Sequence, residues 1–150
     1  MKIAIASDHA GFQLKEFLVQ RLLGDHELLD LGTFDTESVD YPDFAVSVGA
    51  SVRRGEAERG ILVCGTGIGM AIAANKLADI RAAVIHDTFS ARVAVEHNDL
   101  NVLALGGRVV GTELAFEVVR AFLGARFAGG RHQRRLDLIE ALERPIPDLS

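Results

Sequence analysis

Tryptophan is absent from the sequence, and cysteine occurs only once, at Cys64. A lone cysteine cannot form an intramolecular disulfide, and it indicates a reducing compartment. The five histidines show no tight metal-ligand spacing, and a zinc site is not expected with a single thiol. We therefore predict a protein without disulfides, metal or any other cofactor.

Positively charged residues are fewer than negatively charged ones: the sequence has 16 Lys and Arg and 21 Asp and Glu, which gives a net charge of −5. Such a surface attracts neither nucleic acid nor anionic membranes, so we expect neither as a partner. A phosphate ligand has to be held by a local positive cluster. The apolar run before Asp8 is too short for a signal peptide or a spanning helix, so we expect a cytoplasmic protein.

Aliphatic residues and glycine are abundant, with 49% hydrophobic residues and 15 glycines in 150 positions. This length fits one domain spanning residues 1–150, and the composition suits a buried parallel sheet with glycine-rich turns. Five short apolar runs predict strands, at residues 2–6, 26–31, 60–64, 81–85 and 101–105. Amphipathic stretches predict helices between and after them, at residues 12–23, 44–53, about 68–76, 90–97 and 112–123, the last with Thr112 as N-cap. Residues 33–43 read as a loop.

Strand–helix alternation of this kind predicts an α/β fold: a Rossmann-like (flavodoxin-like), doubly wound, five-stranded parallel sheet. A further charged helix is expected over about residues 131–144, with apolar Leu136, Ile139 and Leu142 at helical spacing. A terminal helix with such a narrow apolar stripe packs either on a partner subunit or on its own domain. The pattern alone leaves both arrangements open.

The sharpest local signal is the glycine-rich turn Cys64-Gly65-Thr66-Gly67-Ile68-Gly69, placed where a strand ends and a helix begins. Ligands of open parallel sheets bind beyond the carboxyl ends of the strands. Free N–H groups at a helix start hold anions and favour a thiolate over a thiol. This one turn is thus able to supply both a base and an anion hole. The plainer alternative is that Cys64 is a small buried hydrophobe.

Met70 argues against three competing interpretations of this turn. A Walker A loop ends in Gly-Lys-Ser/Thr, which does not follow here. A dinucleotide fingerprint in register with Gly65 and Gly67 needs glycine at position 70, and a cysteine phosphatase of the usual spacing needs arginine there. Met70 itself reads as a core or pocket-wall residue.

Other polar residues gather at predicted element ends. Asp8-His9 follows the first strand and shares the sheet edge of Cys64, although Asp8 also suits a helix N-cap. His97-Asn98 closes a helix, where a histidine also simply complements the helix dipole. His86-Asp87 is assigned to the pocket rim, and His26 and His132 show nothing beyond surface positions.

Arg131 and Arg135 are four residues apart, which places both guanidinium groups on one helix face. Together with His9 they could grip a phosphate through charge-assisted hydrogen bonds. A solvated basic face is the alternative.

Five motifs, spread from the first predicted strand to the last predicted helix, resemble those of a known protein family. They are SDHAG (7–11), DYPD (40–43), CGTGIGM with IAANK (64–76), HNDLNVLALGGRVVG (97–111) and GGRHQRR (129–135). Together they resemble the type B ribose-5-phosphate isomerases, whose superfamily includes galactose-6-phosphate isomerase subunits. One branch of the family has a glutamate base in place of Met70, so the chain is more similar to the cysteine branch.

The resemblance implies a homodimer, or a dimer of dimers, with two active sites at the subunit interface and a small-molecule sugar phosphate as substrate. It implies that Cys64 moves a proton between C2 and C1 and that Thr66 helps the hydroxyl protons change places. By the same resemblance, His97 from the neighbouring subunit opens the furanose ring. Asp8, which bonds the sugar hydroxyls, is the fourth implied catalytic residue. The implied substrate-binding positions are the turn backbone at Gly65, Gly67, Ile68 and Gly69 on the enediolate, Asn98 beside the intermediate, His9, Arg131 and Arg135 on phosphate, and Tyr41 and Arg108 lining the site.

The expected activity is therefore interconversion of ribose 5-phosphate and ribulose 5-phosphate through an enediolate. Isomerisation of allose 6-phosphate, galactose 6-phosphate or a tetrose phosphate is the nearest alternative, because the sequence does not give the pocket depth. A non-catalytic phosphosugar or nucleotide sensor is a third hypothesis, but it leaves the thiol at the anion hole without a role.

Overall fold

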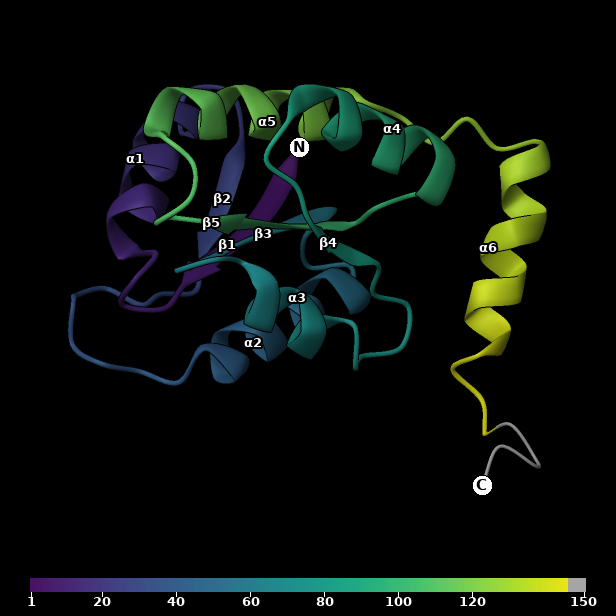
Figure 1. The fold of residues 1–150 in the computed structure, drawn as a ribbon, viewed down its shortest axis with the longest axis horizontal. Helices are drawn as coiled ribbons and strands as arrows, with labels where there is room; N and C mark the ends of the chain where they lie inside the picture. Colours follow the sequence, from purple (N-terminus) through teal and green to yellow (C-terminus); the bar gives the residue numbers. More distant parts are fainter. Residues whose placement is uncertain (146–150) are drawn as a thin grey trace.

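The computed structural model describes residues 1–145 as a five-stranded sheet flanked by helices (Figure 1). All four strand pairs are parallel, and the strand order is β2-β1-β3-β5-β4. The strands are β1 (Lys2–Ser7), β2 (Glu27–Asp30), β3 (Arg59–Cys64), β4 (Ala82–Val84) and β5 (Val102–Gly106). The helices are α1 (Phe12–Leu22), α2 (Tyr41–Arg53), α3 (Ile68–Ala74), α4 (Thr88–Asn98), α5 (Thr112–Gly124) and α6 (Arg131–Ala141).

The sheet is covered on both faces, with α1, α4 and α5 on one side and α2 and α3 on the other (Figure 1). Successive strand residues point to opposite faces, so Ile3 and Ile5 enter the core under α1 and α5, while Ala4 and Ala6 enter the core under α2 and α3. Burial on both faces explains why the strands are nearly continuous apolar runs without polar alternation. The predicted fold class is therefore confirmed.

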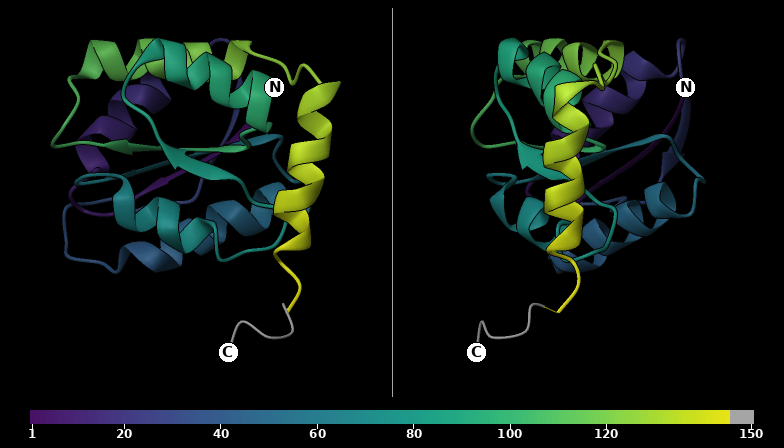
Figure 2. Two further views of the ribbon diagram at one scale, coloured as in Figure 1. Left: turned by 45° about the vertical axis from the view of Figure 1, so that its right-hand side comes forward. Right: turned by 90° about the vertical axis from the view of Figure 1, so that its right-hand side faces the viewer.

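Helix α6 stands apart from these two layers. It crosses the amino ends of the strands and spans the height of both helical layers (Figure 2). Leu136 is buried against the body of the protein, whereas Leu138, Ile139 and Leu142 are about half exposed or more. Most of the apolar stripe of α6 thus remains uncovered within one chain.

Several boundaries differ from the sequence-based prediction. Helix α2 begins at Tyr41, inside the predicted loop, because Pro42 occupies its first turn, where a missing N–H costs nothing. Gly111 is the N-cap of α5, so the N-cap predicted at Thr112 was wrong by one residue. Strand β5 lies between β3 and β4, which exchanges the last two strands of the flavodoxin order. No helix among residues 1–145 has the length and apolar character that crossing a membrane requires.

Candidate active site

Cys64 is the last residue of β3 and lies at the carboxyl edge of the sheet, 5% exposed. Its sulfur accepts a hydrogen bond from the backbone N–H of Gly67, over an N–S distance of 3.0 Å. Gly67 adopts φ +81°, and a Cβ there would lie 3.0 Å from the backbone of Leu105. Only glycine therefore suits this position, and it turns a backbone amide toward the thiol as α3 begins at Ile68.

The turn after β1 lies against the same edge. The Asp8 amide donates to the carbonyl of Val63 over 3.1 Å, and Asp8 Oδ1 accepts the N–H of Gly11 at 3.0 Å. A Cβ on Gly11 would lie 2.3 Å from the Val63 carbonyl oxygen, so this turn packs directly on β3. The prediction that Asp8 shares the edge of Cys64 is confirmed. Asp8 is not the N-cap of α1, because Gly11 holds that position.

The turn after β5 holds the glycine turn from the other side. The amide of Gly107 donates to the carbonyl of Cys64 at 2.7 Å, and that of Arg108 donates to the carbonyl of Gly65 at 3.0 Å. A Cβ on Gly65 would lie 3.3 Å from Nη1 of Arg108, so the guanidinium covers the turn. His86 Nε2 in turn accepts the N–H of Gly106 at 2.8 Å.

Tyr41, the first residue of α2, and His9, in the turn after β1, complete this edge. The ring of Tyr41 packs over Gly69, where a Cβ would lie 2.6 Å from the ring carbons. His9 Nδ1 accepts the N–H of Val39 at 3.2 Å. Because Nδ1 accepts this bond, Nε2 is the ring nitrogen that remains to donate to a ligand.

Within the glycine turn, the exposed Thr66 keeps its hydroxyl close to the backbone: Thr66 Oγ1 accepts the N–H of Ile68 at 3.3 Å. Met70 is fully buried, which confirms it as a core residue and leaves Cys64 as the base candidate of this turn. In residues 1–145 no group of three His, Cys, Asp or Glu is arranged to hold a metal ion.

His97, Asn98, Arg131 and Arg135 lie at the opposite edge of the sheet. His97 and Asn98 end α4, directly before Asn101 and the start of β5, whereas Cys64 pairs with Gly106 at the end of β5. The length of β5 alone separates the two edges by about 13 Å. Helix α6, which carries both arginines, stands at the same amino edge (Figures 1 and 2). Within one chain the predicted site residues thus form two groups, called half-sites below, and the two groups do not meet.

His132 corrects the sequence analysis, which treated it as a surface residue. It is only 9% exposed, and its ring stacks on that of His97 with centroids 4.2 Å apart and 14° between the planes. Burial lowers the pKa of His132, and the positive charges of His97, Arg131 and Arg135 lower it further. The four-residue spacing from His132 to the buried Leu136 is the signal that could have revealed it.

Comparison with known proteins identifies the family of this chain. A sequence model described as ribose/galactose isomerase matches residues 3–139. The chain belongs to the ribose/galactose isomerase family. It is 51% identical to ribose-5-phosphate isomerase B of Escherichia coli (strain K12) over 143 residues, which cover 95% of this chain and 96% of that protein.

Solved structures of the family have the same fold. Ribose-5-phosphate isomerase B of Clostridium thermocellum superposes with a TM-score of 0.94 at 51% identity, covering 95% of this chain and 97% of that one. The Mycoplasma genitalium enzyme, solved with bound ribulose-5-phosphate, superposes with a TM-score of 0.90 at 40% identity and 97% coverage of both chains.

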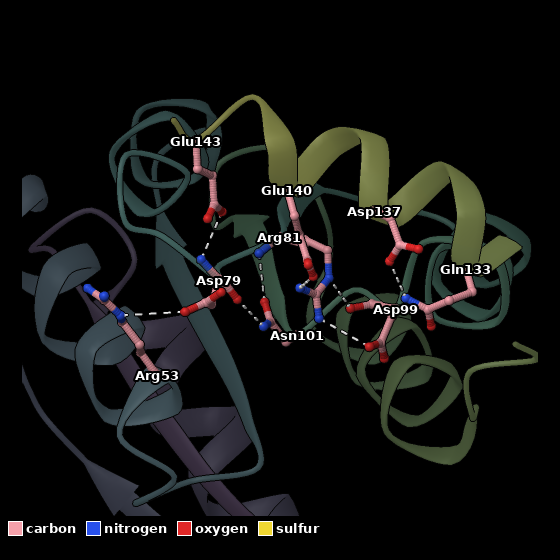
Figure 3. Close-up of polar contacts among 9 residues, drawn as sticks. All are labelled: Arg53, Asp79, Arg81, Asp99, Asn101, Gln133, Asp137, Glu140 and Glu143. Atoms are coloured by element: carbon pink, nitrogen blue, oxygen red, sulfur yellow. Dashed lines mark hydrogen bonds and ion pairs between the residues drawn. The ribbon is translucent and has the colours of Figure 1, made fainter. Parts of the chain in front are cut away.

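A groove of about 680 Å³ lies beneath α6 and not over Cys64. Ile139 and Leu142 line it from α6, and Leu77, Ile80 and Leu100 line it from the body. It belongs to the attachment of α6, where Glu140 and Glu143 reach Arg81 and the amide of Asp79 (Figure 3).

Proposed function

We propose that this protein interconverts ribose 5-phosphate and ribulose 5-phosphate, with Cys64 as the base. The observation that carries the proposal is the contact between the Cys64 sulfur and the Gly67 amide, at an edge that also holds Asp8, His9 and Tyr41. Membership of the ribose/galactose isomerase family and relatives about half identical in sequence support this reaction over other chemistry at such an edge.

In this reaction the Cys64 thiolate takes the proton from C2 of the open-chain aldose and returns it to C1, while a hydroxyl proton moves from O2 to O1. The intermediate is an enediolate, and backbone amides of the turn at Gly65–Gly69 stabilise its oxygen. Losing one such preorganised donor typically costs about 3–4 kcal/mol. Thr66 is exposed on the same turn and passes the hydroxyl proton between O2 and O1. The buried carboxylate of Asp8 accepts hydrogen bonds from the sugar hydroxyls. Arg108, over Gly65, lines the same edge.

A second copy of the chain supplies the rest of the site. Within one chain His97, Asn98, Arg131 and Arg135 stand at the wrong edge for Cys64, while His9 offers its Nε2–H on the right one. In a two-fold dimer the amino edge of one copy meets the carboxyl edge of the other, twice. The guanidinium groups then join His9 on the phosphate, His97 opens the furanose ring, and Asn98 supports the intermediate.

Apolar surface at both edges supports this pairing. Leu138, Ile139 and Leu142 are exposed on α6. Near the glycine turn, Ile68, Ile72, Phe89 and Val109 are each more than half exposed. Apolar surface gathered in this way is typical of a subunit interface. A homodimer is the smallest assembly that completes the site, and a reducing cytoplasm preserves its free thiol.

Turnover by the purified chain of four-, five- and six-carbon aldose phosphates tests the substrate, with Cys64→Ser as the control. We expect ribose 5-phosphate to give the highest kcat/KM and Cys64→Ser to lose about 10²–10⁴-fold of it. A higher kcat/KM for a six-carbon aldose phosphate would assign a different substrate. Sugar phosphate binding without deuterium exchange at C1 or C2 in the wild type would instead make the protein a sensor.

Mixed dimers test the shared site. One subunit carries Cys64→Ser, the other Arg131→Ala with Arg135→Ala, and the heterodimer is purified through two different affinity tags. If sites are shared, one site of the mixed dimer is intact and about half of the wild-type activity returns at low substrate concentration. If each chain builds its own site, both sites stay defective and no activity returns.

A further inference from the structure

The stacked pair of His97 and His132 joins two elements far apart in the sequence. His97 is half-buried on the last turn of α4, and His132 is the second residue of α6. Their rings are nearly parallel, 14° between planes, with centroids 4.2 Å apart. One face of the His97 imidazole therefore packs against the buried ring of His132.

Two other contacts fix α6 next to the end of α4. The amide of Ala128 donates to the carbonyl of Glu96 over 2.9 Å, which anchors the segment entering α6 one residue before His97. The side chain of Arg81 binds both the carbonyl and the carboxylate of Asp99, at 2.8 and 3.1 Å, and reaches Glu140 of α6 at 4.0 Å (Figure 3). The position of His132 relative to His97 is thus held from both sides of the stack.

We propose that His132 is a positioning residue for His97, whose ring plane it fixes for proton transfer to the sugar ring oxygen. The inference rests on the proposed function, in which His97 opens the furanose. A histidine ring rotates over a broad, roughly two-fold χ2 profile, so a half-buried imidazole without a partner samples many orientations. Proton transfer requires the ring nitrogen within hydrogen-bond reach of the sugar oxygen, and a displacement of about 1 Å can cost about 10²-fold in rate.

The charge on the pair fits this role. Burial, then the positive charges of His97, Arg131 and Arg135, lower the pKa of His132, which favours its neutral form. A neutral neighbour fixes the ring of His97 without adding charge repulsion beside the proton that His97 transfers to the ring oxygen. The two arginines stay free for phosphate, because His132 and Leu136 form the buried face of α6 while both arginines are exposed.

Two reactions of the same enzyme separate positioning from structural support. Ribose 5-phosphate is a furanose and must be opened before isomerisation. Ribulose 5-phosphate cannot close to a furanose, because its O5 carries the phosphate. Deuterium uptake from D₂O at C1 of ribulose 5-phosphate therefore needs the base and the phosphate grip but no ring opening.

We expect His132→Leu to slow conversion of ribose 5-phosphate about tenfold or more while C1 deuterium uptake stays within about twofold of wild type. His132→Phe keeps a flat stacking partner and is expected to restore most of the conversion rate. Leu136→Ala, one turn further along α6, is the matched control, because it loosens the helix without touching the stack and slows both reactions alike.

His97→Gln separates this inference from the proposed function. A selective loss of ribose 5-phosphate conversion in His97→Gln confirms the ring-opening role. If His132→Leu then slows both reactions equally, or His132→Phe is as slow as His132→Leu, the positioning role is overturned while the proposed function stands. If His97→Gln shows no selective loss, the ring-opening role fails, and the positioning role of His132 with it.

Discussion

The sulfur of Cys64 and the backbone nitrogen of Gly67 lie 3.0 Å apart and share a hydrogen bond. The N–H dipole points at the sulfur, where negative charge resides while the residue acts as a base. It depends on the left-handed conformation of Gly67, which brings the fourth residue of the turn back over the sulfur. The reactivity proposed for Cys64 thus depends on the backbone of a residue without a side chain.

Gly67→Ala is expected to damage both stability and activity. Alanine at φ +81° costs about 1–2 kcal/mol in backbone strain, and its Cβ would press on the backbone of Leu105. We expect the free energy of unfolding in urea to fall by at least that amount and kcat to fall with it. Gly124→Ala is the matched control, because no atom lies within 4 Å of its Cβ position. Equal effects of the two substitutions would contradict the role of the turn.

The buried Lys15 forms an ion pair with the partly exposed Asp30 that the sequence did not reveal. Its side chain is fully buried, and Nζ lies 2.8 Å from both carboxylate oxygens of Asp30. We expect Lys15→Met to lower the free energy of unfolding by about 3 kcal/mol, because Asp30 is left without its counter-charge. Urea denaturation of Lys15→Met, Asp30→Asn and the double variant measures the coupling. A double variant that loses the sum of the two single losses would show that the pair does not interact.

Stability is expected to depend on pH through His132. Its pKa in the folded protein is lowered, first by burial and then by the charges of His97, Arg131 and Arg135. The unfolded chain therefore binds the proton more readily than the folded protein does. The contribution of neutral His132 is complete above the ordinary pKa of about 6.5 and is lost as the pH falls toward the lowered value. Between about pH 7 and about pH 5 the wild type should lose more stability than His132→Phe, as measured by urea denaturation. Parallel losses would remove this histidine from the pH dependence.

Leu138→Asp is expected to weaken the dimer without unfolding the chain. Leu138 is exposed on α6 within one chain, so a carboxylate there is penalised only where a second copy covers it. Sedimentation equilibrium should show dissociation, and activity should rise with protein concentration as mass action restores the dimer. Val46→Asp, at an exposed apolar position on α2 away from both half-sites, is the control and should leave assembly unchanged. Dissociation by both variants, or by neither, would argue against α6 as the interface.

The sequence by itself determined the alternation of strands and helices, the parallel sheet, and the glycine turn behind Cys64, because these depend on periodicity and turn chemistry among neighbouring residues. It also placed Asp8 beside Cys64, since parallel strands end at one edge. Only the tertiary structure decided that β5 lies between β3 and β4, that Lys15 meets Asp30, and that His132 stacks on His97. Those contacts join residues distant in the chain, and the side chains that meet there are chosen by packing of the whole domain, which no local pattern encodes.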